Sequence, residues 1–181
     1  QRKQQIMASR SFGTTVSDPH AIKAALTHHI SRAAEKLRAQ QSVCANVYVM
    51  LRTNPFREQD QQYRRTTLVP LDHASADTGV LMKAALKGLR QIFVPGLKYH
   101  KCGVMLGEIE PAGIQQTDLF APVDDPKRLR LMSLMDSINK TQGSGTLHLA
   151  STQLSAAWQM RAGDRSPRYT TCWDELPIAY A

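Results

Sequence analysis

The sequence predicts an α+β fold, in which a four-stranded sheet carries two helices on one face in the order β-α-β-β-α-β, up to about residue 110. Two observations lead to this prediction. Two segments begin with a helix-capping residue and continue with apolar residues at helical spacing. Two other segments alternate between apolar and polar residues, as half-buried strands do. Such elements bury their apolar sides against one another and leave the second face of the sheet open.

The first strand is expected over residues 2–12, ending in a turn at Gly13. The first helix then begins at Asp18 and Pro19, because an aspartate N-cap followed by proline at the first helical position is a typical helix start. One apolar stripe follows at helical spacing, formed by Ile22, Leu26, Ile30, Ala33 and Leu37. This stripe is the predicted contact between the helix and the sheet.

The second strand is expected over residues 43–52, where the hydrophobic period changes to two. Val43, Ala45, Val47, Val49 and Leu51 form the side that helices would cover, and Cys44, Asn46, Tyr48, Met50 and Arg52 form the open side. Asn54 and Pro55 end this strand, and a polar loop leads to a third strand over about residues 63–70. Arg64 or Arg65 from that strand would join the open side.

The second helix is predicted from a cap at Asp77 or Thr78 and ends before Pro95 and Gly96. Its apolar face consists of Leu81, Ala85, Leu89 and Ile92. The last strand is expected over residues 98–108. Cys102, Val104 and Leu106 would face the helices, and Tyr99, Lys101 and Met105 would lie on the open face.

The positive charge of the chain lies entirely in this first block. Up to residue 110 there are 16 lysines and arginines against 8 acidic residues, whereas from residue 111 onward there are 7 of each. A basic block with cations, amides and tyrosines on an open sheet face indicates contact with the phosphates and sugars of a nucleic acid. A solvated basic face is the alternative interpretation of the charge alone.

Several classes of function are not indicated. The three cysteines, Cys44, Cys102 and Cys172, lie far apart and favour free thiols in a reducing compartment. There is no long apolar run or signal peptide. His28 and His29 are adjacent and lack the spacing of two helical metal ligands. No nucleophile motif marks a catalytic triad. We therefore expect no catalytic residue, no metal ligand and no cofactor in this chain.

A short docking peptide follows the basic block. Gln116-Thr117-Asp118-Leu119-Phe120 lies between the breakers at residues 111–113 and Pro122, so its Leu-Phe pair is expected to be exposed for capture by a partner's pocket. A third helix is predicted from Asp125 and Pro126, and its apolar stripe is expected to be Leu131, Leu134, Met135 and Ile138. A short strand over residues 146–150 and a tryptophan-containing tail complete a small α/β extension.

Several motifs together resemble the little finger domain of Y-family translesion DNA polymerases, in particular the UmuC subunit of bacterial DNA polymerase V. The resemblance rests on residues 3–6 and 9–13, Arg52-Thr53-Asn54-Pro55-Phe56, residues 103–106, Trp158-Gln159-Met160 and residues 166–171 before Trp173. It implies a little finger over residues 1–110, a linker over 111–124 and a UmuC-type C-terminal region over 125–181. It covers nearly the whole chain.

The resemblance implies a function for each part. The little finger would grip template-primer DNA during SOS mutagenesis and DNA repair in the bacterial cytoplasm, at the nucleoid. Its candidate DNA contacts are Ser9, Arg10, Ser11, Arg52, Arg64, Arg65 and Lys101. The peptide that binds the replicative sliding clamp is matched by Gln116, Leu119 and Phe120. At its second position this chain has Thr117, whereas a leucine is often found at that position in the family. A UmuD-like accessory subunit and a RecA filament are further implied partners. The catalytic palm carboxylates and their magnesium ions would belong to the missing catalytic domain.

Two other classes remain as alternatives. An RNA recognition motif shares the β-α-β-β-α-β order and the open sheet, although its Lys/Arg-Gly-Phe/Tyr signature is absent here. A pure protein-interaction scaffold would use the docking peptide and leave the basic charge as a solvated face.

Overall fold

The computed structural model describes residues 2–113, 125–143 and 145–149 of the chain. The elements in this part of the chain are β1 (Ile6–Val16), α1 (Pro19–Ala39), β2 (Ser42–Thr53), β3 (Arg64–Ser75), α2 (Thr78–Ile92), β4 (Tyr99–Pro111) and α3 (Pro126–Gln142). The docking peptide at residues 116–120, Cys172 and the tryptophans of the tail lie outside the described residues.

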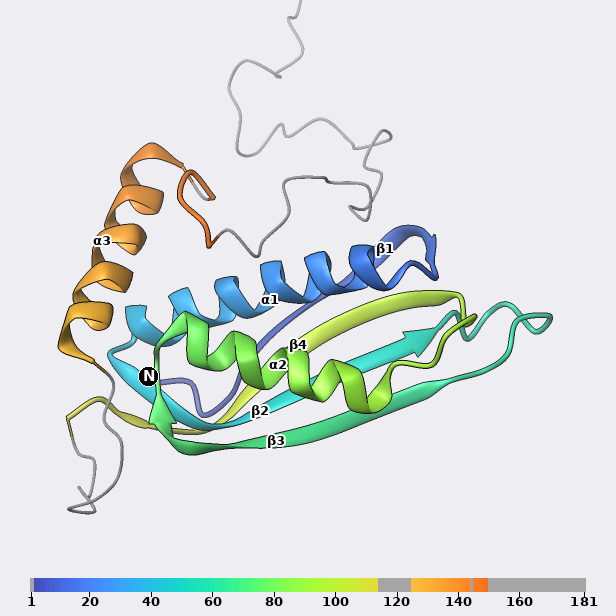
Figure 1. Cartoon of the computed structure of the whole chain (residues 1–181), viewed down its shortest axis with the longest axis horizontal. Coiled ribbons are helices and arrows are strands. Elements are labelled where there is room, and N and C mark those ends of the chain that lie inside the picture. Colours follow the sequence, from blue (N-terminus) through green and yellow to red (C-terminus); the bar gives the residue numbers. More distant parts are fainter. Residues whose placement is uncertain (1, 114–124, 144, 150–181) are drawn as a thin grey trace, which may run out of the picture.

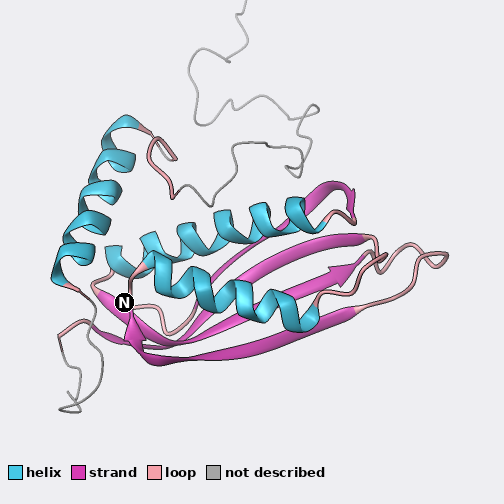
Figure 2. Ribbon diagram, viewed as in Figure 1, coloured by secondary structure: helices cyan, strands magenta, loops and turns pink. Residues whose placement is uncertain are grey.

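The sheet has the strand order β1-β4-β2-β3, and each neighbouring pair is antiparallel. Figures 1 and 2 show α1 and α2 side by side on one face of this sheet, with the other face free of described elements. The predicted fold class and the β-α-β-β-α-β order are therefore confirmed. The long antiparallel pairings fix which side chains share the open face.

All three predicted helix starts are confirmed, because each depends only on local sequence. Asp18 accepts hydrogen bonds from the backbone amides of His20 and Ala21, at 3.0 and 3.2 Å. Asp77 accepts from the Val80 amide at 3.0 Å, and Asp125 accepts from the Lys127 amide at 2.9 Å. Each carboxylate thus satisfies amide groups that have no partner within the helix.

The core lies between the helices and the covered face of the sheet. The predicted stripes of α1 and α2 are buried, with Ile22, Leu26, Ile30, Ala33, Leu37 and Leu81 fully so. Val47, Val49 and Leu51 of β2 meet them from the sheet, together with Cys102, Val104 and Leu106 of β4. Cys44 and Cys102 are buried and form no disulfide among the described residues, and burial raises the pKa of the Cys102 thiol to about 12.

Register shifts account for the main errors in the predicted strands. β1 continues through Gly13 to Val16 instead of turning there, with a shift in its pairing to β4 between Ser11 and Val16. A second shift lies at the start of β4, where Arg52 pairs with Lys101 but Thr53 pairs with Tyr99. An extra residue in one strand turns the following side chain to the other face. Tyr99 therefore points into the core and not onto the open face.

Three further expectations need correction. Cys44 is fully buried, although it was expected on the open side of β2. In place of the expected strand after α3, residues 145–149 form a turn and bends. The expected apolar stripe of α3 is only partly right. Met135 and Ile138 are half-buried, but Leu131 and Leu134 are 51% and 58% exposed, and the buried residue of the helix is Met132, which was not in the predicted stripe.

Candidate nucleic-acid interface

A row of polar and basic residues crosses the open face of the sheet at one end. Ser11 of β1 pairs with Lys101 of β4, Lys101 pairs with Arg52 of β2, and Arg52 pairs with Arg64 of β3. Directly paired residues project to the same face, so these four side chains form one line across all four strands. We call Ser11, Lys101, Arg52 and Arg64 the basic row.

The register divides the predicted DNA contacts between the two faces. Ser9 follows the basic row on the same face, where it pairs with Gly103. Arg10 instead pairs with Cys102, and Arg65 pairs with Leu51. Cys102 and Leu51 belong to the core, so the exposed Arg10 and Arg65 lie at the two outer edges of the helix-covered face. The structure thus places Arg64, and not Arg65, on the open face.

The electrostatic environment of the basic row is strongly positive. Within the part of the chain that the structure describes, no ion pair involves Arg52, Arg64 or Lys101. The imidazole of His100 lies among these cations. Burial first, and then the charges of Arg52, Arg57 and Lys101, lower the pKa of His100 below its ordinary value. The lowering beyond the effect of burial comes from these three cations, which all act on the same imidazole.

The sequence analysis did not identify two further cations, Arg57 and Lys98, which share a carboxylate of the β2–β3 loop. Arg57 lies in the β2–β3 loop, and its charge acts on His100. Lys98 precedes β4, and its Nζ lies 3.4 Å from the Oδ1 of Asp60. Asp60 also lies 4.0 Å from Arg57 and has only 11% of its side chain exposed. The carboxylate of Asp60 therefore lies between two cations. The spacing of these residues in the sequence did not indicate that they come together.

A second row on the open face is apolar. Met7, Met105, Tyr48 and Leu68 are aligned across the four strands by direct pairing. Met7 and Leu68 are 52% and 45% exposed, which is unusual for large apolar side chains on a sheet. The absence of a side chain at Gly107 leaves room for the Tyr48 ring, because a Cβ at that glycine would lie 2.9 Å from the ring's Cε2 atom. The open face is therefore basic at one end and apolar two rows away.

No cluster of three or more histidine, cysteine, aspartate or glutamate side chains among the described residues could hold a metal ion. No helix of this part of the chain is both long and apolar enough to cross a membrane. The features that stand out are the open sheet face and the surface where α3 meets the helices.

A four-stranded antiparallel sheet with two helices on one face and a basic row on the other is consistent with the little-finger fold. The chain belongs to the impB/mucB/samB family, whose C-terminal domain it matches over residues 3–119. The resemblance to the C-terminal part of a UmuC-like, Y-family polymerase is thereby confirmed. Residues 129–179 match a second unit, described as a domain of unknown function, DUF4113.

Three relatives from Salmonella typhimurium show how much of the family's length is present. The chain is 37% identical to Protein SamB and 35% identical to Protein ImpB, in both cases over 98% of this chain and 42% of the relative. It is 36% identical to Protein UmuC of strain LT2, over 96% of this chain and 42% of that protein. The chain thus spans about two fifths of the length of these curated relatives.

Proposed function

We propose that this chain is the non-catalytic C-terminal part of an error-prone translesion DNA polymerase, and that its open sheet face holds the template-primer duplex during SOS mutagenesis and DNA repair. The observation that carries the proposal is the basic row. Three cations from three neighbouring strands line up on one face, and no carboxylate among the described residues pairs with them. Phosphate oxygens are the anions that such a row fits.

The dimensions of the sheet favour backbone contact over base reading. Four strands at a spacing of about 4.8 Å span about 14 Å from edge to edge. The major groove is about 12 Å wide and admits a two-stranded ribbon, so a four-stranded sheet would lie across a groove. Its cations would then meet the phosphates that border the groove. Binding of this kind positions a duplex without selecting a sequence, as a polymerase requires.

The remaining predicted contacts fit the same arrangement. Ser9 and Ser11 can donate hydroxyl hydrogen bonds to phosphates from the open face. Arg10 and Arg65 lie at the outer strands, on the other face, where they would reach only phosphates that curve past the edges of the sheet. We therefore propose Arg52, Arg64 and Lys101 as the principal contacts and Arg10 and Arg65 as secondary ones.

The clamp-binding role of Gln116, Leu119 and Phe120 is a separate proposal, supported by the family resemblance of the peptide. Burial of a leucine and a phenylalanine contributes roughly 1.5–3 kcal/mol each before ordering costs. Contacts with a UmuD-like subunit and a RecA filament, and a location in the bacterial cytoplasm, are proposed on the same resemblance. Magnesium and the catalytic carboxylates are assigned to the rest of the parent protein.

A titration that compares duplex DNA with single-stranded RNA over a range of salt concentrations tests the proposal. We expect tighter binding of the duplex and a steep loss of affinity with salt, because phosphate contacts release counterions. An RNA recognition motif would bind the single strand through stacked aromatic residues. Tyr48 is the aromatic residue on the described open face, since Tyr99 lies in the core. A preference for single-stranded RNA would overturn the proposal, and binding of neither nucleic acid would favour the protein-interaction scaffold.

A further inference from the structure

Two arginine–aspartate pairs, which we call the exchanged pairs, join helix α3 to the end of α1 and to the start of α2. Arg38 near the end of α1 donates from Nε and Nη2 to the two carboxylate oxygens of Asp136 in α3, at 2.6 and 2.7 Å. In the opposite direction, Arg128 of α3 donates from Nε and Nη2 to Asp77 at the start of α2, at 2.8 and 2.9 Å. Each partner therefore supplies one cation and one anion, and both pairs have the two-bond geometry that fixes orientation as well as distance.

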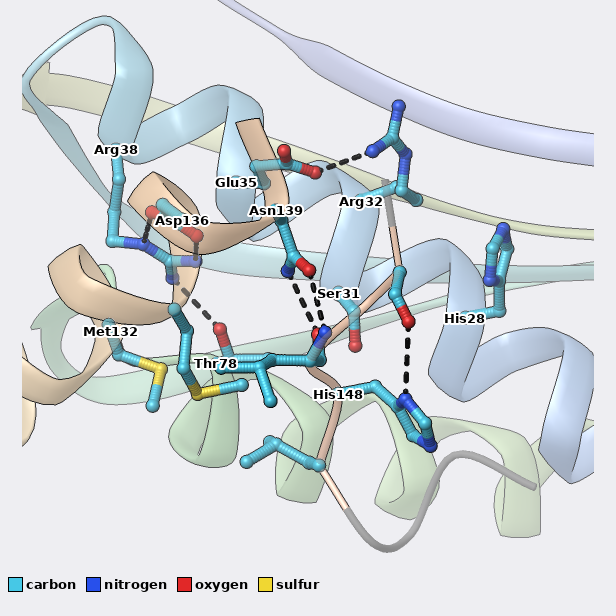
Figure 3. Close-up of a pocket in the computed structure, with 14 residues that line it drawn as sticks. His28, Ser31, Arg32, Glu35, Arg38, Thr78, Met132, Asp136, Asn139 and His148 are labelled. Atoms are coloured by element: carbon cyan, nitrogen blue, oxygen red, sulfur yellow. Dashed lines mark hydrogen bonds and ion pairs between the residues drawn. The ribbon is translucent and has the colours of Figure 1, made fainter. Parts of the chain in front are cut away.

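Arg38 joins three parts of the chain. Besides Asp136, its Nη1 donates to the Ala76 carbonyl and to the Thr78 hydroxyl, both at 2.8 Å. Figure 3 shows Arg38 facing Asp136 on one side and Thr78 on the other. Its side chain is only 14% exposed. Because every nitrogen of the guanidinium has a partner, this arginine fixes the corner between α1 and α2 at the place where α3 meets them.

Asp77 is the more deeply buried member of the second pair, with 1% of its side chain exposed. Burial alone would raise the pKa of this carboxyl, but hydrogen bonds from Arg128 and from the Val80 amide outweigh burial, so that the pKa is lowered. Gly79 leaves room for the pair. A Cβ at this position would lie 2.5 Å from Nη2 of Arg128 and 2.9 Å from Oδ1 of Asp77.

The apolar part of this contact centres on Met132. Met132 is the buried residue of α3, whereas Leu131 and Leu134 are exposed. A helix of 17 residues is only marginally stable on its own in water. The side chain of Asn139 exchanges two hydrogen bonds with the backbone of Leu147, at 2.8 and 2.9 Å, so the turn after α3 is fastened to it. The two exchanged pairs are thus the main polar attachment of α3 to the layer below.

We propose that the corner between the end of α1 and the start of α2 is the docking surface for the C-terminal unit of unknown function, and that the two exchanged arginine–aspartate pairs are its recognition element. Figure 1 shows α3 across the ends of α1 and α2, away from the open face of the sheet. Helix α3, which leads into that unit, then lies on the little finger away from the proposed DNA face. This inference does not depend on DNA binding.

The inference can be tested by hydrogen exchange on the full chain, followed by mass spectrometry. The variants are Arg128→Ala, Asp136→Ala and the double substitution, with Arg130→Ala as the matched control because Arg130 is an exposed arginine of the same helix without an ion pair in the described structure. We expect exchange of the α3 amides to rise about tenfold or more in the double variant, while the β2 and β4 amides stay protected. The control should match the unmodified chain, and 1 M salt should act in the same direction as the substitutions.

A fourth variant breaks one pair without removing a charge. Gly79→Ala places a Cβ against Nη2 of Arg128 and against Oδ1 of Asp77, which also caps the Val80 amide. We therefore expect faster exchange in α3 and at the first amides of α2, beside unchanged exchange in the later turns of α2. Unchanged exchange of α3 in the double variant would overturn the inference, and so would an equal effect of Arg130→Ala. DNA affinity serves as an independent readout, and it should be the same in all these variants.

Discussion

Arg52 and Lys101 lie directly opposite each other on neighbouring strands, and neither forms an ion pair with any described residue. Like charges at such a position destabilise a sheet. The Nε atom of Arg52 is also buried without a hydrogen-bond partner in the described structure, which adds to the cost. A pair that costs stability in the free protein is explained if an anion compensates it in the complex.

The first prediction concerns stability. Arg52→Ala should leave the free energy of unfolding unchanged or raise it by up to about 1 kcal/mol, because the substitution relieves the repulsion from Lys101. Urea denaturation of the free chain measures this. Arg38→Ala is the contrasting variant, since it removes an arginine whose partners include Asp136 and Thr78. A clear loss of stability in Arg52→Ala would show that the residue has a structural role.

The second prediction uses His100 as a reporter of the field at the basic row. In the free chain its pKa is lowered by burial and by the charges of Arg52, Arg57 and Lys101. Phosphates placed beside these cations would offset their charges, so duplex DNA should raise the pKa of His100 toward its ordinary value. NMR titration of the imidazole, with and without duplex, gives both values. If the pKa is the same in the complex, the duplex does not lie at the basic row.

The third prediction concerns acid stability. Burial first, and then the charges of His28 and Arg10, lower the pKa of His29 from 6.5 to about 4. The unfolded chain binds this proton more tightly than the folded chain, so stability is full above about pH 6.5 and falls as the pH drops toward 4. The difference corresponds to about 3 kcal/mol. Unfolding experiments at pH 7 and pH 4.5 should show a smaller loss in His29→Gln than in the control His20→Gln, whose histidine is exposed. Equal losses would contradict the assignment to His29.

The fourth prediction concerns the clamp-binding peptide. Leu119→Ala combined with Phe120→Ala should abolish binding to a sliding clamp and leave DNA affinity unchanged, because the pair supplies the apolar area of the peptide. Thr117→Leu should strengthen binding. The double variant Leu131→Ala with Leu134→Ala removes exposed apolar side chains elsewhere and serves as the control. Unaltered clamp affinity in a calorimetric titration of the first variant would refute the role of the peptide.

The sequence was sufficient for features that depend on neighbours along the chain. The caps Asp18 and Asp125, the choice of Asp77 or Thr78 for α2, and the apolar stripe of α1 were predicted because capping and helical spacing are local. Tyr99 was misplaced because one register shift turned it into the core, and a period of two carries no sign of such a shift.

The composition of the candidate site needed the structure. Arg64 and Arg65 are adjacent, so the sequence left open which of them joins the open face, and the pairing of Arg64 with Arg52 decides it. The pairing of Arg128 with Asp77 joins residues 51 positions apart and had no signal in the sequence. The expected apolar stripe of α3 followed the usual rule that apolar faces are buried. Ionic docking through Asp136 and Arg128 overrides that rule here.

The salt dependence of duplex binding tests the central claim most directly. Two triple variants are compared. The basic-row variant carries Arg52→Ala, Arg64→Ala and Lys101→Ala. The α2 variant replaces three exposed cations of α2, on the other side of the sheet, by alanine: Lys83, Lys87 and Arg90. Both variants lose three positive charges. We predict that the basic-row variant binds duplex much more weakly and that its log–log salt slope is smaller by about three, whereas the α2 variant keeps nearly the full slope. Equal slopes in the two variants would contradict the account, because binding would then depend on net charge and not on the open face.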